Sequence, residues 1–459
     1  MTTARGPARE PAREPAREPL RRPAREPLRE PREPLRDPRE SLREPTGTAR
    51  ERPAGGRTPP CHLGEAQFQR GPTRAYRDLR REHGAVAPVL LDGGLPAWLV
   101  LGYRELHYVL SHPEIFARDP RHWAGWDDVP PDWAALPGVG HRPSMLRAEG
   151  AEHRRRYTAV QDVLGAVDLF ELRARAEEIT DDVIDAFAGR GETDLIDSFA
   201  HRVPALVLAS LCGPPEVDTA GLVHDLIVLI DDGPDAAEGH QRVRDRLRWL
   251  LADRREHPDD DIVSRLIVHP AGLDDEEVVE DLAVVFGFGV RAVAGWIGNS
   301  LRLLLTDGSF ALDLSGGRRS VMQALNQVLW EDTPMQVVAG RWATRNTQLG
   351  GQRIEAGDMI ALGLGAGNAD PQVRRGRAPD AHPGTGTSAN SAHLSFGHGE
   401  HRCPYPAQEI AEVVTRTAVE ALLDRLPNMW IAVPADALGW RRTAWNRALT
   451  ALPVRFSPV

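Results

Sequence analysis

The stretch His393–Ala411 constrains this chain most, because it places one cysteine between a glycine-rich loop and the start of a helix. Gly397 and Gly399 allow positive φ, so the backbone there can approach a bulky ligand closely. The apolar pattern predicts a helix over Ala407–Leu423, whose N-terminal amides lie near the Cys403 sulfur and favour the thiolate. Cys403 is therefore the candidate reactive residue.

A thiolate held by a loop next to an apolar helical region suits the axial ligand of a haem iron. Two other interpretations of this stretch remain. His398, His401 and Cys403 could be zinc ligands, although the sequence has no second Cys/His pair at the spacing of a zinc finger. Cys403 could also be an ordinary buried cysteine.

The run Phe396-Gly397-x-Gly399-x-His401-x-Cys403 resembles the haem-binding loop of the cytochrome P450 family in its soluble bacterial form. The resemblance extends over residues 65–459. It implies a mainly α fold with a small β region and a bound haem (iron protoporphyrin IX). It also implies that Cys403 ligates the iron and that Phe396 and Gly397 belong to the loop around it.

Residues 1–60 repeat Arg-Glu-Pro-Ala or Arg-Glu-Pro-Leu, with proline too frequent for a helix and charge too dense for a core. We expect a disordered tail, followed by a haem-thiolate domain over 65–459. Arginine outnumbers acidic residues in the tail. It could therefore dock on an acidic surface, or it could be a solvated extension with no partner.

Composition narrows the functional classes. The formal net charge is −10, and the chain contains arginine but no lysine. We interpret this arginine preference as coding bias and not as a nucleic-acid-binding surface. Three widely spaced cysteines argue against a disulfide framework. No run reaches eighteen apolar residues, and the N-terminus lacks the apolar core of a signal peptide. We expect a cytoplasmic protein without a membrane anchor.

The resemblance assigns further residues to the haem. His153, on a helix expected over Glu152–Val163, matches a histidine that reaches a propionate in the family. Four residues on, the family has an arginine and this chain has Tyr157, which can donate a hydrogen bond but carries no positive charge. Arg341, on an expected strand, and His401 complete the propionate contacts that the resemblance implies.

The longest apolar helical pattern covers Glu276–Leu305. In the family this helix crosses the haem and carries an acid and an alcohol that serve oxygen activation. Here the positions are Arg291 and Ala292, which can supply neither a carboxylate relay nor a hydroxyl. Arg291 could instead hold a substrate carboxylate, or it could form a salt bridge to an acid elsewhere on the distal side.

The helix expected over Ser320–Trp330 ends, in the family, in a Glu-x-x-Arg pair that is bound to a later arginine. This chain has Gln327 and Trp330, with Asp380 and Ala381 near the place of the third partner. Loss of one charge would leave the others uncompensated, whereas concerted replacement can be nearly neutral. We therefore expect neutral packing there, as in an unusual actinobacterial subgroup that lacks the motif.

Three functions fit the sequence. The first is a monooxygenase that uses O2 and a ferredoxin electron donor, with a small-molecule substrate between the Arg291 helix and the Trp123–Trp133 loop. The second is a peroxide-dependent oxygenase of carboxylic acids, in which the substrate replaces the missing acid. The third is a haem-binding sensor or complex partner with little turnover, motivated by the altered motifs and the tail.

Overall fold

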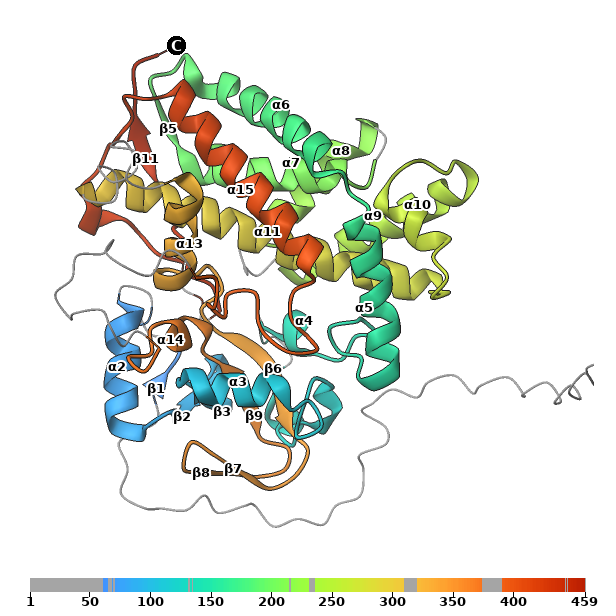
Figure 1. The fold of residues 1–459 in the computed structure, drawn as a ribbon, viewed down its shortest axis with the longest axis vertical. Coiled ribbons are helices and arrows are strands. Elements are labelled where there is room, and N and C mark those ends of the chain that lie inside the picture. Colours follow the sequence, from blue (N-terminus) through green and yellow to red (C-terminus); the bar gives the residue numbers. More distant parts are fainter. Residues whose placement is uncertain are drawn as a thin grey trace, which may run out of the picture. The chain divides into compact units, whose positions relative to one another are not determined.

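The computed structural model describes residues 61–64, 68, 71–130, 133, 135–213, 216–230, 236–308, 320–373, 390–441, 443 and 445–458. All of them belong to one unit, Thr58–Val459. Helices make up most of it, and a sheet region lies against their lower side in Figure 1. The tail over 1–60 and the positions Asp380 and Ala381 lie outside the described residues.

Helix α11 (Asp275–Thr306) is the longest described helix, with 32 residues. A capping box starts it: the Asp274 side chain accepts from the Glu277 amide, and the Glu277 side chain accepts from the Asp274 amide. Its apolar residues are largely buried, because other helices surround it on several sides. These are α5 (Gly150–Gly165), α7 (Arg202–Ser210), α8 (Glu216–Val228), α9 (Ala236–Glu256), α10 (Ile262–Ile267), α13 (Val321–Glu331) and α15 (Tyr405–Arg425).

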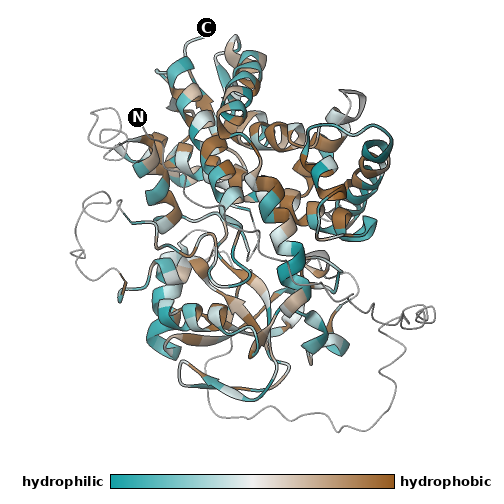
Figure 2. Cartoon of the chain, turned by 45° about the vertical axis from the view of Figure 1, so that its right-hand side comes forward, coloured by the Kyte–Doolittle hydropathy of each residue, from teal (hydrophilic) through white to brown (hydrophobic). Residues whose placement is uncertain are grey.

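Helix α6 (Leu169–Ala188) packs along α15, and the two lie side by side in Figure 1. Its N-cap Asp168 accepts from the amides of Phe170 and Glu171. Figure 2 shows the hydrophobic faces of the helices turned toward one another and the hydrophilic faces turned outward. The helical core thus comes from the amphipathic pattern that the sequence displays.

The main sheet has the order β1-β2-β3-β9-β6-β4, and two smaller sheets pair β10-β11-β5 and β7-β8. The strands are β1 (Cys61–His62), β2 (Val86–Leu90), β3 (Pro96–Val100), β4 (Phe116–Ala117), β5 (Glu192–Asp194), β6 (Val338–Ala343), β7 (Thr347–Leu349), β8 (Gln352–Ile354), β9 (Met359–Leu362), β10 (Trp430–Ile431) and β11 (Pro453–Arg455). Strands β2 and β3 form a hairpin around Asp92-Gly93-Gly94, whose residue types favour a turn. Helices α2 (Pro72–His83), α3 (Tyr103–Ser111) and α14 (Leu364–Asn368) flank the sheet region.

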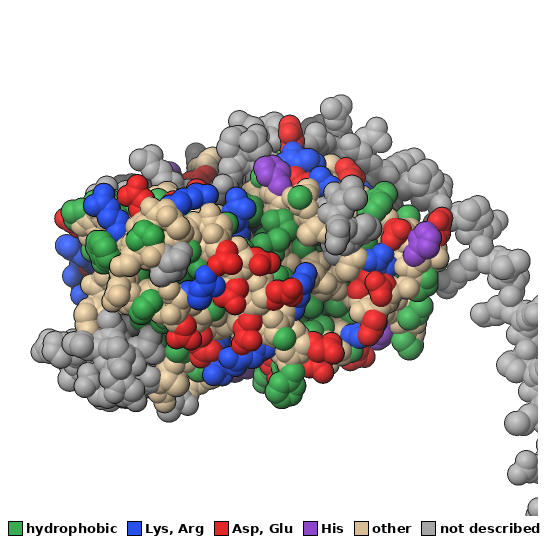
Figure 3. All heavy atoms as spheres, turned by 90° about the horizontal axis from the view of Figure 1, so that it is seen from above, with side chains coloured by type: hydrophobic (Ala, Val, Ile, Leu, Met, Phe, Trp, Pro, Cys, Tyr) green, Lys and Arg blue, Asp and Glu red, His purple; other side chains and the backbone are tan. Residues whose placement is uncertain are grey.

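On the face shown in Figure 3, acidic and basic side chains alternate without a continuous basic patch. None of the described helices combines the length and the apolar character needed to cross a bilayer.

A buried ion pair joins α5 to α11. Arg156 donates to both carboxylate oxygens of Asp281 at 2.8 Å, and both side chains are fully buried. Asp281 also accepts from the backbone amide of Met145 at 2.5 Å. The pair therefore fixes the loop between α4 (Leu136–Val139) and α5 against the central helix, because a buried bidentate pair tolerates little displacement.

Neutral groups occupy the place of the Glu-x-x-Arg pair. Gln327 and Trp330 are both buried. Gln327 donates to Glu331 at 3.1 Å, while Trp330 donates its indole N–H to the Asn390 carbonyl at 3.0 Å and packs edge-on against His393 at 5.8 Å. The described contacts of these two residues are hydrogen bonds and ring packing, while the third position, near Asp380 and Ala381, lies outside the described residues.

A second buried polar cluster, which the sequence did not predict, lies at the end of α13, and we call it the Asp332 cluster. Asp332 accepts from Arg302 at 2.8 Å and from Arg447, and it is itself buried. The Arg447 guanidinium lies 3.6 Å from the centre of the Trp440 ring. Asn299 on α11 donates to the carbonyls of Asp332 and Arg447. The Asp332 cluster joins α11, α13 and the C-terminal segment through side chains of both charge signs.

We predict that Trp330→Arg lowers the free energy of unfolding by about 3 kcal/mol, because it buries a guanidinium beside neutral partners. Glu331 cannot compensate easily, since adjacent helix residues do not face each other. Urea unfolding would measure the loss. Trp330→Phe is the matched control, which keeps a ring and should cost about 1 kcal/mol for the lost hydrogen bond. Equal or greater stability of Trp330→Arg would contradict the account.

Candidate functional site

The Cys403 loop has the positive φ angles that its glycines allow. Gly397 and Gly399 have φ of 73° and 74°. A side chain at Gly399 would overlap the carbonyl of Leu110, so this residue also lets the loop pack against α3. The Cys403 amide donates to the Phe396 carbonyl at 2.9 Å and closes the loop.

Helix α15 begins at Tyr405, two residues before the predicted start at Ala407. Proline is tolerated in the first turn of a helix, because the amide it lacks has no partner there. Pro406 therefore does not delay the helix. Gln408 donates to the Cys403 carbonyl at 2.8 Å and ties the loop to this first turn.

The expectation that the α15 N-terminus lowers the thiol pKa is wrong for the protein without a metal. Burial raises the pKa of Cys403 to about 12. Coordination by a metal ion deprotonates a thiol outright. The thiolate form at Cys403 thus depends on a bound metal.

Three predicted haem residues lie together beside this loop. The ring centres of His401 and His153 are 3.9 Å apart, and the rings of His153 and Tyr157 are 5.3 Å apart on one face of α5. Glu400 lies 3.4 Å from His153 Nδ1. Burial lowers the pKa of His153, with Glu400 opposing, and burial followed by Arg341 lowers that of His401 strongly. Both histidines are therefore favoured as neutral hydrogen-bond donors.

The zinc interpretation finds no support in this geometry. His401 faces His153, whereas His398 stacks on His107 of α3 with ring centres 4.0 Å apart. In the described part of the chain, no three His, Cys, Asp or Glu side chains gather as a metal site.

Arg341 meets two arginines that the sequence did not single out, Arg118 and Arg147. All three are buried. A bulge in the β6–β9 pairing between Val338 and Arg341 redirects the strand here, and Gly340 has φ of 97°. A side chain at Gly340 would come within 2.5 Å of Arg147 and 3.3 Å of Arg118, so the glycine makes room for both guanidinium groups.

Three buried arginines, Arg118, Arg147 and Arg341, and the two neutral donors His153 and His401 form what we call the cation cluster, after its arginines. Burial lowers the pKa of Arg118 to about 10, and burial followed by Arg118 lowers those of Arg147 and Arg341 well below their ordinary value. Arg341 Nε and Nη1, Arg118 Nε and His401 Nδ1 are buried without a hydrogen-bond partner in the described part. Buried donors of one charge sign fit an anion with several oxygens, such as two carboxylates.

Phe396 connects the loop to the central helix. Its ring lies 6.1 Å from the Trp296 ring of α11 and 5.8 Å from the His393 ring. Cys403 is therefore held on the side of the molecule where α11 crosses, as the resemblance implies for a haem between them.

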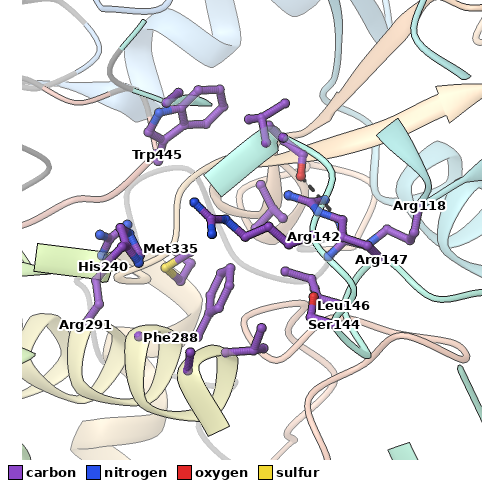
Figure 4. Close-up of a pocket in the computed structure, with 18 of the residues that line it drawn as sticks. Arg118, Arg142, Ser144, Leu146, Arg147, His240, Phe288, Arg291, Met335 and Trp445 are labelled. Atoms are coloured by element: carbon purple, nitrogen blue, oxygen red, sulfur yellow. Dashed lines mark hydrogen bonds between the residues drawn. The ribbon is translucent and has the colours of Figure 1, made fainter. Parts of the chain in front are cut away.

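A cavity of about 210 Å³ lies along α11, and we call it the α11 cavity. Ala283, Val284, Gly287, Phe288 and Arg291 line it from α11, and His240 and Arg244 from α9. Arg118 and Arg147 line its other end, so the cavity reaches the cation cluster. Figure 4 shows Arg142 extending into it, with His240 and Arg291 on one side and Arg118 and Arg147 on the other.

Arg291 and Ala292 differ in their surroundings. Arg291 lines the cavity and donates to the carbonyl of Leu229, just beyond α8. Ala292 is half-buried on α11 and contributes only a methyl group. The two positions that carry the acid and the alcohol in the family therefore hold a guanidinium group at the cavity wall and a methyl group.

The Trp123–Trp133 loop contributes to the core more than to the cavity. Trp123 and Trp133 are buried, with ring centres 6.0 Å apart, and Trp126 packs edge-on against Trp123 at 5.0 Å. Residues just after this loop, including Val139 and Arg142, line the cavity instead. The tryptophans pack together in the hydrophobic core and support that wall of the cavity.

Comparisons with known proteins agree with this arrangement, although no protein-family profile matches the chain. The chain is 29% identical over 389 residues to cytochrome P450 107B1 of Saccharopolyspora erythraea, covering 83% of this chain and 95% of the relative. It is also 29% identical to the cytochrome P450 monooxygenase PikC of Streptomyces venezuelae, covering 85% and 92%. The solved structure of the Bacillus subtilis cytochrome P450 PksS superposes with a TM-score of 0.74 at 25% identity, covering 86% and 99%.

The loop around Cys403, the long helix that crosses beside it and the likeness over almost the whole length of these relatives converge on one assignment. The chain is a homologue of bacterial cytochrome P450 proteins and has their fold, and these proteins are haem-containing oxidoreductases.

Proposed function

We propose that this protein is a monooxygenase that transfers one oxygen atom of O2 to a small organic molecule. A ferredoxin supplies the two electrons, and the second oxygen atom leaves as water with two protons. The observation that supports the proposal best is the cation cluster, whose buried donors lie between the Cys403 loop and the α11 cavity. The haem, when bound, supplies the oxygen activation and the oxygen transfer.

Different residues bind different parts of the cofactor. Cys403 is the iron ligand, and Phe396 and Gly397 shape the loop around it. Arg341, with Arg118 and Arg147, supplies positive charge to the two propionates. His153 and His401 donate neutral hydrogen bonds, and Tyr157 adds a phenolic donor where relatives of this type carry an arginine. Gly340 allows the arginines to converge.

Arg291 and Ala292 cannot pass a proton. A guanidinium remains charged at neutral pH, and a methyl group has no exchangeable hydrogen. The protons that O2 reduction consumes must then come from water in the α11 cavity or from the substrate itself. General acid-base help is worth roughly 10²–10⁴-fold in rate, so turnover of a neutral substrate with O2 should be slow by a factor of that order.

Arg291 at the cavity wall favours a second candidate, a peroxide-dependent oxygenase of carboxylic acids. Peroxide brings both oxygen atoms and both electrons, so no ferredoxin is needed. A substrate carboxylate paired with Arg291 would supply the acid-base group that α11 lacks. The two candidates share the cofactor and the cavity and differ in oxidant and substrate charge.

Replacing Cys403 by alanine should abolish the absorption band near ~450 nm of the reduced CO complex, because that band requires an axial thiolate. Cys212→Ala is a matched control, since Cys212 is buried in the helical core and does not belong to the loop. Survival of the band in Cys403→Ala would show that the iron ligand is another residue.

Arg341→Gln should release haem roughly tenfold faster or more, since a charge-assisted hydrogen bond contributes about 1.5–3 kcal/mol. Transfer of haem to an excess acceptor protein measures the rate directly. Arg175→Gln, which removes an exposed arginine paired with Glu178 on α6, should leave the rate unchanged. An unaltered rate in Arg341→Gln would remove the propionate role from this residue.

A product assay with a panel of carboxylic acids and the corresponding alcohols distinguishes the two candidate functions. Each compound is incubated once with peroxide and once with O2, a ferredoxin and its reductase. If the second candidate holds, peroxide converts the acids preferentially, and Arg291→Ala lowers kcat/KM for them roughly tenfold or more. Fast, well-coupled O2 turnover of the alcohols, unaffected by Arg291→Ala, would instead support the ferredoxin-dependent monooxygenase.

A further inference from the structure

Glu400 is a carboxylate of the Cys403 loop that faces the cation cluster. Its Oε1 lies 3.4 Å from Nδ1 of His153, and both atoms are buried without a hydrogen-bond partner in the described part of the chain. The His153 side chain is 2% exposed, whereas that of Glu400 is 29% exposed. Because an ordinary hydrogen bond of this kind spans ~2.7–3.2 Å, a small rotation of the partly exposed Glu400 is enough to form one.

A second cation beside Glu400 lies at the surface. Arg154 Nη1 is 3.7 Å from the same oxygen, and its side chain is 67% exposed. Water screens an ion pair with one partner so exposed, and the long arginine side chain loses entropy when it is held in one place. Arg154 therefore competes only weakly with the buried His153 for this carboxylate.

The two ring nitrogens of His153 cannot both donate a hydrogen bond while the ring is neutral. A neutral imidazole has one N–H and one lone pair, whereas an imidazolium has two N–H groups. If Nδ1 donates to Glu400, then Nε2 is the nitrogen that remains for a haem propionate, and in the neutral ring it is an acceptor. A propionate is itself an acceptor. Contact with both carboxylates therefore requires the imidazolium form of His153.

The charges around Arg341 leave room for one further cation when haem is bound. Arg118 and Arg147 act on Arg341 as like charges, and Glu149 and Glu400 act on it as opposite charges. The two propionates raise the number of carboxylates near these three guanidinium groups to four. One imidazolium then balances the charge of the group.

Haem binding changes the pKa of His153 in a defined direction. Burial lowers this pKa in the chain alone, and Arg118 and Arg341 lower it as well, while Glu400 raises it. Propionates that pair with the two arginines offset their effect and add negative charge, so the pKa of His153 rises on haem binding. The protonated ring therefore strengthens haem binding at low pH, and this gain is lost as pH rises through the pKa of the loaded protein.

We propose that Glu400 is a positioning residue for the haem. It accepts the Nδ1–H of His153, so that His153 binds a propionate through Nε2 as an imidazolium, and haem binding takes up one proton from water at this ring. The inference rests on the proposed function in assigning His153 to a propionate. It extends that function by replacing the neutral hydrogen bond of His153 with a charged one and by giving Glu400 a role.

Nitrogen NMR of the haem-loaded protein tests the protonation state of His153 without turnover. The histidine rings are isotopically labelled, and the protein is studied as its diamagnetic reduced CO complex. An imidazolium shows two protonated nitrogens, whereas a neutral ring shows one protonated nitrogen and one with a lone pair. Loss of a signal in His153→Gln assigns that signal to His153. Near neutral pH we expect the imidazolium in the wild type and a neutral ring in Glu400→Gln.

The rate of haem transfer to an excess acceptor protein shows whether this proton contributes to haem binding. At mildly acidic pH, Glu400→Gln should release haem several-fold faster than the wild type, and the difference should shrink as pH rises. Return of a proton to Cys403 accompanies release in both proteins, so it cancels in the ratio of their rates. Glu178→Gln, which removes an exposed carboxylate paired with Arg175 on α6, is the matched control and should keep the wild-type profile.

Two results overturn the proposal. One is a neutral His153 ring in the loaded wild type, and the other is an imidazolium that persists in Glu400→Gln. Circular dichroism and haem content show whether each variant is folded. The wild-type spectrum still decides the protonation state if Glu400→Gln does not load haem.

The same samples distinguish failure of this inference from failure of the proposed function. If His153 is an imidazolium that depends on Glu400 but no product forms with either oxidant, the role of Glu400 is supported and the oxygenase function is not. If product forms while His153 is neutral, the oxygenase function is supported and the role of Glu400 is overturned.

Discussion

The structure depends on the burial of several arginine side chains next to one another. Arg118, Arg147 and Arg341 come from three segments far apart in sequence and meet beside His153 and His401. Burial of cations without counter-ions is strongly unfavourable. A bulge, a glycine with positive φ and an anchored loop bring them together, and this arrangement suits the propionates of the proposed haem.

Cofactor loading and folding are consequently linked. A ligand that binds only the folded state stabilises it according to its concentration and affinity. In the proposed site, the haem propionates would also neutralise part of the positive charge of these buried arginines. The free thiol follows the same logic, since burial keeps Cys403 protonated until a metal takes the proton's place. The protein without haem should therefore be the less stable form, and cofactor supply should control how much folded protein accumulates.

Much of this was predictable from the sequence, and the failures have physical causes. The positive φ of Gly397 and Gly399, the long helix through Arg291 and the hairpin near Asp92 follow from local rules of glycine, periodicity and turn residues. Arg118 and Arg147 were missed, because periodicity does not show which distant side chains converge. The pKa of the thiol was misjudged, because the field of a helix end is visible in a sequence whereas depth of burial is not.

The contacts of Trp330 have a consequence for the conditions in which the protein keeps its shape. An indole N–H bonded to a carbonyl and a ring packed edge-on carry no net charge, so dissolved ions do not screen them. A charged Glu-x-x-Arg set in the same place would weaken as ionic strength rises wherever water reaches it. The contacts of Trp330 therefore do not weaken as ionic strength rises, whereas salt screens the exposed ion pairs of the surface, such as Arg175–Glu178.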